Sequence, residues 1–178
     1  NNDDTYVGSG GFGWTNELPQ TDFDGHVRTS DMWGFTESQE TVGVSPEMFA
    51  EFIFPYQIPI QERFGLNCYG CCEPLDKRWH IVKQIPNLRR ISVSPWANIA
   101  DMAEKLEDRY IFSMKPSPTD LAMDGFDEAR IRSELRAALQ KTRGCRVEVL
   151  MKDNHTIRND PRRVVRWVQI AREEAEAL

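Results

Sequence analysis

The sequence predicts an α/β fold in which helices cover a parallel β-sheet. Short segments rich in β-branched, aromatic and aliphatic residues alternate with segments of helical periodicity along the 178 residues. Gly, Pro or Asp bounds the short segments, as is typical of strands. Alternation of this kind favours a parallel sheet, because parallel neighbours need a crossover connection that is usually a helix.

Six segments have the composition of strands. They cover residues 5–7, 27–33, 66–69, 89–93, 110–113 and 146–151. The segment between Gly8 and Gly25 contains several glycines and no periodicity, so we expect a long loop there.

The clearest helix start lies at Ser45. A capping serine is followed by Pro46 at the first helical position and by the acidic Glu47 in the first turn. Pro55 and Pro59 follow, and we expect them to kink this helix or end it early.

Four further helices are expected, and they open at Pro74, Asn98, Asp127 and Asp160. Helical spacing predicts that the last helix turns one apolar side inward. That side consists of Val164, Val165, Val168 and Ala171.

Composition limits the classes of protein to consider. The chain is 40% hydrophobic and 28% charged with a net charge of −6, which suits one folding unit over residues 1–178. Mild acidity and the lack of a basic run argue against a nucleic-acid partner. No apolar stretch approaches the roughly 20 residues that span a bilayer, and the first residues do not look like a secretory leader, so we expect no membrane association.

Three of the four cysteines fall within five residues, at positions 68, 71 and 72, and the fourth is Cys145. A disulfide framework would distribute its cysteines to join distant loops. The cluster therefore favours reduced thiols in a cytoplasmic protein, either as a reactive or metal-binding group or, for Cys68 and Cys145, as small buried apolar side chains.

Chemically active side chains follow the predicted strands. In parallel β/α folds the residues just beyond the carboxyl ends of the strands line the active site. The residues found there are Trp33, Tyr69, Cys71, Cys72, Glu73, Ser94, Trp96, Lys115, Lys152, Asp153 and His155.

The cysteine pair has two interpretations. Cys71 and Cys72 are either a reactive pair, or two buried thiols followed by a helix-capping acid at Glu73. Reactivity requires an electropositive environment, which Lys115, Lys152 or a helix that begins after Pro74 would supply.

His155 and Lys115 also have two interpretations each. An isolated histidine is commonly a hydrogen-bonded structural residue, but a strand end beside Asp153 favours a functional role for His155. Lys115 is either a site residue or an ordinary surface lysine.

Five segments resemble the uroporphyrinogen decarboxylase-like superfamily, which includes corrinoid- and coenzyme M-dependent methyltransferases. Residues 30–34 read Ser-Asp-Met-Trp-Gly and look like the family's Asp-x-Trp strand end. Residues 45–56 are similar to its Ser-Pro-Glu-x-Phe…Pro-Tyr helix. Residues 69–71 take the place of its His-x-Cys strand end, residues 114–118 that of its Gly-Asn-x-x-Pro segment, and residues 153–161 that of its last turn and helix start.

The resemblance implies a (β/α)8 barrel of the TIM type, of which this chain would hold the C-terminal five to six β/α units. The missing strands are expected from an upstream segment or from another copy of the chain, because closure needs eight strands.

The resemblance also implies candidate metal ligands. In the methyltransferase branch a His-x-Cys pair and a later Cys hold zinc. Here Tyr69 replaces the His, Cys71 matches the Cys, and the later Cys falls at Asn154 or His155, so a zinc site of Cys71, Cys72 and His155 departs from the family pattern.

Methyl transfer is the function that this resemblance favours, with a corrinoid or a small methylated molecule as substrate and a corrinoid protein as a possible partner. We predict His155, Asp153 and Lys115 as catalytic residues. We predict that the substrate is bound by Trp33, Tyr69, Glu73, Ser94 and Trp96. The alternatives are a metal-free decarboxylase of tetrapyrrole polycarboxylates, in which His155 would match a family histidine, and a barrel that binds a ligand without turnover.

Overall fold

A five-stranded parallel sheet forms the centre of the molecule. The computed structural model describes residues 6–8 and 10–178. The strands are β3 Trp33–Thr36, β4 Leu66–Tyr69, β5 Leu88–Val93, β6 Ile111–Met114 and β7 Arg146–Val149. Each pairs in parallel with the next along the chain, in the order β3-β4-β5-β6-β7, which confirms the predicted parallel sheet. Within the described residues the outer edges of β3 and β7 have no partner strand, so the sheet is open.

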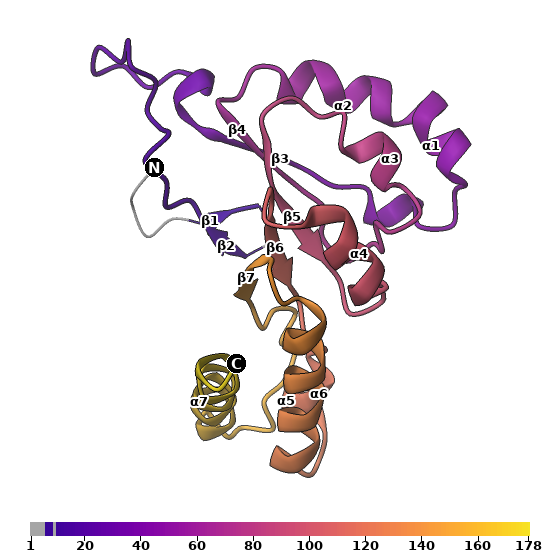
Figure 1. Ribbon diagram of the computed structural model, residues 1–178, viewed down its shortest axis with the longest axis vertical. Coiled ribbons are helices and arrows are strands. Elements are labelled where there is room, and N and C mark those ends of the chain that lie inside the picture. Colours follow the sequence, from indigo (N-terminus) through magenta and orange to yellow (C-terminus); the bar gives the residue numbers. More distant parts are fainter. Residues whose placement is uncertain (1–5, 9) are drawn as a thin grey trace.

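The first predicted strand is not part of this sheet. Strand β1 (Tyr6–Val7) instead forms an antiparallel hairpin with β2 (Gly11–Phe12), and Thr5 lies outside the described residues. The expected long loop after Gly8 therefore begins with a strand. Figure 1 shows this hairpin on the opposite side of the sheet from α3 and α4.

The second predicted strand, at residues 27–33, is placed wrongly. A short 3-10 helix occupies Thr29–Asp31, where the buried Asp31 carboxylate accepts hydrogen bonds from the backbone N–H and the guanidinium of Arg28. Strand β3 begins only at Trp33. Trp33 consequently lies at the amino end of its strand and not at the carboxyl end. A second 3-10 helix follows at Gln39–Thr41.

The helix start at Ser45 is confirmed. Helix α1 spans Pro46–Phe52, and the Ser45 hydroxyl accepts a hydrogen bond of 3.2 Å from the N–H of Met48. The chain breaks at Ile53 and resumes as α2, Phe54–Gln61, which accommodates Pro59. The helix predicted from Pro74 is wrong at its start, since α3 covers only Trp79–Val82.

The later helices are α4 Ile99–Leu106, α5 Thr119–Ala122, α6 Glu128–Lys141 and α7 Arg162–Glu176. Of these helices, α4, α6 and α7 begin near the predicted caps, and the short α5 was not predicted. The side chains of Asn98 and Asp127 accept hydrogen bonds from the first turns of α4 and α6. No helix in residues 6–8 and 10–178 is long and apolar enough to cross a membrane.

The inward side of α7 differs from the prediction. Val164, Val165 and Val168 are exposed, while Trp167 and Ile170 are buried; of the predicted side only Ala171 packs inward. These two side chains pack with Leu121, Ile131 and Leu135, because α7 lies beside α6 (Figure 1).

The two faces of the sheet differ in polarity. The face toward the helices is apolar, with Ile91 and Phe112 wholly buried in the main core. On strands β5 to β7 the other face, here called the inner face, carries polar side chains at alternate positions. They are Arg90, Ser92, Ser113, Lys115 and Glu148.

Arg90 connects the inner face to the hairpin. Its guanidinium forms an ion pair with Glu148, two strands away, and donates to the carbonyl oxygens of Val7 and Phe12. The buried cation therefore links strand β5 with β7 and with the N-terminal hairpin.

Candidate functional site

Two thiols, an ammonium and a carboxylate meet at the carboxyl-end edge of the sheet. Cys71 and Cys72 follow β4, and Lys152 and Asp153 follow β7. The Lys152 Nζ lies 3.1 Å from the Cys71 Sγ and 3.2 Å from the Cys72 Sγ, and the two sulfurs are 3.7 Å apart. The Asp153 carboxylate lies 3.3 Å from the Cys72 Sγ and 3.2 Å from the Lys152 Nζ. We call these four residues the Cys–Lys cluster.

The surroundings of Cys72 and Lys152 determine their protonation states. The Cys72 thiol donates to Asp153, so it serves as a proton-bearing group. Burial raises the pKa of Cys72 to about 11, with Lys152 acting against the rise and Asp153 and Cys71 adding to it. For Lys152, burial opposes the charge, but hydrogen bonds to both sulfurs and to Asp153 outweigh it and raise the pKa. The ammonium therefore stays charged, and Cys72 stays a thiol at neutral pH.

Buried polar contacts fix the backbone that carries the cysteines. One Glu73 carboxylate oxygen accepts from the Cys71 N–H at 2.9 Å and the other accepts from the Ser38 N–H at 2.8 Å. The Ser92 hydroxyl donates to the Cys71 carbonyl at 3.0 Å. Gly70 has φ +94°, and a Cβ there would lie 2.8 Å from a Leu75 methyl group. The cysteine loop is thus positioned from β5, from the loop after β3 and by a turn that suits glycine.

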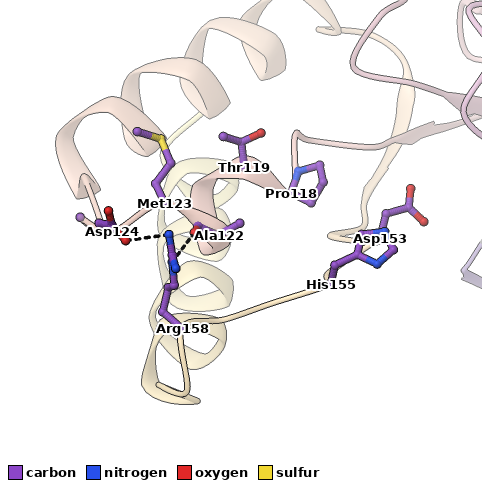
Figure 2. A pocket seen from close by; sticks show the side chains of 9 residues that line it. Pro118, Thr119, Ala122, Met123, Asp124, Asp153, His155 and Arg158 are labelled. Carbon is purple, nitrogen blue, oxygen red and sulfur yellow. Dashed lines mark hydrogen bonds and ion pairs between the residues drawn. The ribbon is translucent and has the colours of Figure 1, made fainter.

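A surface hollow of about 550 Å³ adjoins the cluster. Asp153 and His155 lie on one side of it, and Arg158, Asp124 and Met123 on the other (Figure 2). The Arg158 guanidinium donates to the Ala122 carbonyl and pairs with Asp124. Asp153 belongs to both the cluster and the hollow, and it is the residue that separates the hollow from the thiols. We call it the Asp153 hollow.

Lys115 is a buried residue of the inner face. It is 2% exposed and its ammonium donates to the Ser113 hydroxyl. Burial lowers the pKa of Lys115 to about 8, although the nearby Glu148 favours its charge. The surface-lysine interpretation is wrong, and the lysine that contacts the thiols is Lys152.

The residues predicted to bind substrate do not converge. Trp33 lies at the far end of the sheet and donates to the Gly13 carbonyl. The Tyr69 hydroxyl turns toward α2 and donates to Gln57, and burial raises its pKa. Trp96 is 77% exposed. Ser94 is buried, and its hydroxyl has no hydrogen-bond partner among the described residues.

Glu73 has a structural role in this structure, since both of its oxygens hold backbone N–H groups. It does not cap a helix, because α3 begins six residues later at Trp79. For the same reason no helix N-terminus follows Pro74 directly to supply positive charge to the thiols.

The predicted metal ligands Cys71, Cys72 and His155 are not gathered into a metal site. In the part of the chain that the structure describes, no group of three or more His, Cys, Asp or Glu side chains is arranged to hold a metal ion. Catalytic zinc takes three protein ligands and one open position. The Lys152 ammonium also bridges the two sulfurs, so this donor set does not fit zinc.

The ion pair of Arg90 and Glu148 was missed in the sequence. The sequence feature that could have indicated this ion pair is the alternation of polar and apolar residues within strands β5 to β7, because such alternation is typical of a sheet with one polar face. Lys152 was recognised only as a possible source of charge, because nothing local in the sequence shows that β7 ends close to β4.

Comparison with known proteins gives no relative. No protein-family model matches the chain, and no curated protein or solved structure matches it. The functional argument therefore rests on the geometry of the Cys–Lys cluster.

Proposed function

We propose that the chain is part of a uroporphyrinogen decarboxylase-like barrel enzyme that transfers methyl groups, with Cys71 as the sulfur nucleophile. The observation that carries the proposal is the Lys152 ammonium 3.1 Å from the Cys71 Sγ at the carboxyl ends of parallel strands. Thiolates are the reactive form of cysteine, and a neighbouring cation favours them.

Contacts that reach across the inner face support a curved, barrel-like sheet. Strands β4 and β7 are separated by β5 and β6, so their ends would lie about 14 Å apart in a flat sheet with neighbouring strands about 4.8 Å apart. The contacts of Lys152 and Asp153 with the cysteines, and that of Arg90 with Glu148, span the inner face. A sheet that curves toward this face, as a barrel wall does, brings such groups together.

The proposed transfer has two steps. In the first, an electron pair of the Cys71 thiolate forms a bond to the methyl carbon, and the bond from that carbon to the donor breaks with its electron pair leaving on the donor. In the second, an acceptor attacks the same methyl carbon and Cys71 departs as the thiolate. Lys152 stabilises the thiolate before the first step and after the second.

Other residues of the site have supporting roles. Cys72 donates to Asp153 and holds that carboxylate at the border of the Asp153 hollow. The hollow has room for a small methylated molecule or for one edge of a corrinoid. His155 lines it and would give a proton to the departing group of the donor. No step needs a metal ion.

Methylcobalamin is a suitable test donor, because loss of its methyl group changes its absorption spectrum. We expect the protein to accelerate that change and to gain one methyl group on Cys71, detected by peptide mass spectrometry. Cys71→Ser should remove both signals. Cys145→Ser is the matched control, since Cys145 lies at the amino end of β7 and contacts Ala103.

A protein that leaves methylcobalamin unchanged, or that gains the methyl group equally on Cys71 and Cys145, would contradict the proposal. In the latter case the reaction would be that of any accessible thiol.

A further inference from the structure

The geometry of the cysteine pair points to a second property, which does not depend on methyl transfer. We infer that Cys71 and Cys72 form a chelating dithiol site for trivalent, thiophilic metalloids such as organoarsenicals. Three observations carry this inference: the distance between the sulfurs, their shared exposure to solvent, and the number of donors present.

The distance suits one bridging atom. The sulfurs are 3.7 Å apart. Two bonds of about 2.3 Å, the length of a zinc–sulfur bond, span this distance when they meet at roughly the tetrahedral angle. A bridging atom with bonds of similar length therefore needs no large movement of either side chain.

Oxidation to a disulfide fits the pair less well. Neighbouring Cα atoms are about 3.8 Å apart across a trans peptide, whereas the Cα atoms of disulfides are usually about 4.4–6.8 Å apart. The short distance between the two Cα atoms disfavours an S–S bond, so both sulfurs remain available to bind one bridging atom. Cys71 and Cys72 are both half-buried, so a small reagent can reach them.

The number of donors selects the kind of ligand. The cluster offers two sulfurs; its carboxylate, Asp153, is paired with Lys152, and no group of three or more His, Cys, Asp or Glu side chains in the described residues is arranged to hold a metal ion. Zinc needs more protein ligands than this. A monosubstituted arsenic(III) centre needs only two sulfurs, because its third bond is to its own organic group.

The reaction is balanced without an oxidant. An arsenoxide, R–As=O, reacts with two thiols to give R–As bonded to both sulfurs and one molecule of water. The two S–H bonds break, two As–S bonds form, and the arsenic oxygen leaves with both protons. Lys152 loses its two sulfur acceptors and keeps its ion pair with Asp153 at 3.2 Å.

Phenylarsine oxide is the probe for this site. We expect one phenylarsenic adduct on the intact chain by mass spectrometry, together with the loss of two thiols that react with Ellman's reagent. Dimercaprol, a dithiol, should remove the adduct. A monothiol that supplies the same concentration of thiol groups should not.

Single variants test the chelate. Cys71→Ser and Cys72→Ser should each weaken binding by roughly 10²–10⁴-fold, because the second sulfur acts at a high effective concentration. Cys145→Ser should bind as the original chain does. Lys152→Met keeps both sulfurs and should retain the adduct, which tests the site even if a serine variant folds poorly.

Retention of the adduct with similar affinity in either serine variant would overturn the inference. So would an adduct that maps to Cys68 or Cys145, or no adduct on a folded chain in which Cys71 and Cys72 react with Ellman's reagent.

Discussion

Lys152 and Lys115 are both partly or wholly buried cations, yet their surroundings affect them in opposite ways. Lys152 has three anionic or sulfur acceptors, which raise its pKa in spite of burial. Lys115 has a hydroxyl neighbour, and burial lowers its pKa to about 8. One lysine is therefore held in the charged form, and the other is close to losing its proton under physiological conditions.

Replacement of Lys152 by Met should slow the alkylation of Cys72. Lysine lowers the pKa of this thiol, so its removal shifts the pKa further above 11 and decreases the thiolate fraction at any given pH. The pH dependence of iodoacetamide labelling at Cys72, followed by peptide mass spectrometry, should move to higher pH. Labelling of Cys145 is the internal control, and an unchanged Cys72 profile would show that the ammonium does not act on this thiol.

Replacement of Lys115 by Met should stabilise the protein at neutral pH. The pKa of a lysine in the unfolded chain is near 10.4, whereas that of Lys115 in the folded protein is about 8. Between these two pH values the unfolded chain binds more protons than the folded chain does. The contribution of Lys115 to the free energy of unfolding therefore rises with pH in this window. Below pH 8 the cost of burying the charge is fully present. The free energy of unfolding of the variant should exceed that of the original chain by about 1–3 kcal/mol at pH 7, and by less at pH 10.

Urea denaturation at the two pH values measures this difference. Lys77→Met is the control, since Lys77 is exposed. An equal gain from Lys115→Met at both pH values would attribute the effect to packing and not to charge.

At the level of elements, helix α7 shows how a helix with two apolar sides is oriented. Valines at positions 164, 165 and 168 suggested the inward side, but the larger Trp167 and Ile170 occupy it. Glu174 on the same side is buried and forms ion pairs with Arg132 and Arg136 of α6. Aromatic packing and these ion pairs together decide the rotation of the helix.

Truncating side chains on the two sides of α7 should lower the free energy of unfolding by different amounts. Ile170→Ala should lower the free energy of unfolding by about 2–4 kcal/mol, because Ile170 is fully buried. Val165→Ala should change it by less than about 0.5 kcal/mol, because Val165 is 59% exposed. Chemical denaturation of both variants measures the difference, and similar losses would restore the original prediction of an inward-facing valine side.

The sequence predicted the strands unevenly for local reasons. Strand β4 was predicted at its observed bounds because an apolar run ends at Gly70, and a turn there suits glycine. Strand β3 was predicted too early because the hydrogen bonds of Arg28 to Asp31 form a 3-10 helix in a segment with strand-like composition. That error of a few residues also moved Trp33 from one end of the sheet to the other.

The site could be predicted in part from the strand-end rule. Cys71, Cys72 and Asp153 follow two parallel strands and do share one edge of the sheet. The contact of Lys152 with both sulfurs depends on how far the sheet curves between β4 and β7, which no local pattern encodes. Tyr69 was misjudged as a substrate-binding residue because its side chain turns toward α2.

For the molecule as a whole, the edge of β7 is one of the two sheet edges left without a partner strand by the described residues. The strand residues Val147 and Val149 are only half-buried, and they line a groove with Val164 and Val168 of α7. Open strand edges and apolar grooves favour association with another chain.

We expect the protein to self-associate through this groove. Sedimentation velocity over a range of concentrations should show a mass above that of one chain at the higher concentrations. Val168→Lys should shift the equilibrium toward the monomer, because it places a charge in the groove. Val165→Lys is the control, since Val165 is exposed but does not line the groove. A chain that remains monomeric at all concentrations would contradict the expectation.

The strand order also determines how the chain can fold while it is being synthesised. Every strand of the sheet after β3 pairs with the strand made just before it, so each β/α unit can add to an existing edge as it leaves the ribosome. Arg90 is the exception, because its Glu148 partner is made 58 residues later. Until then the nascent chain carries an unpaired cation on β5, and the N-terminal hairpin bound to Arg90 is the group that can shield it first.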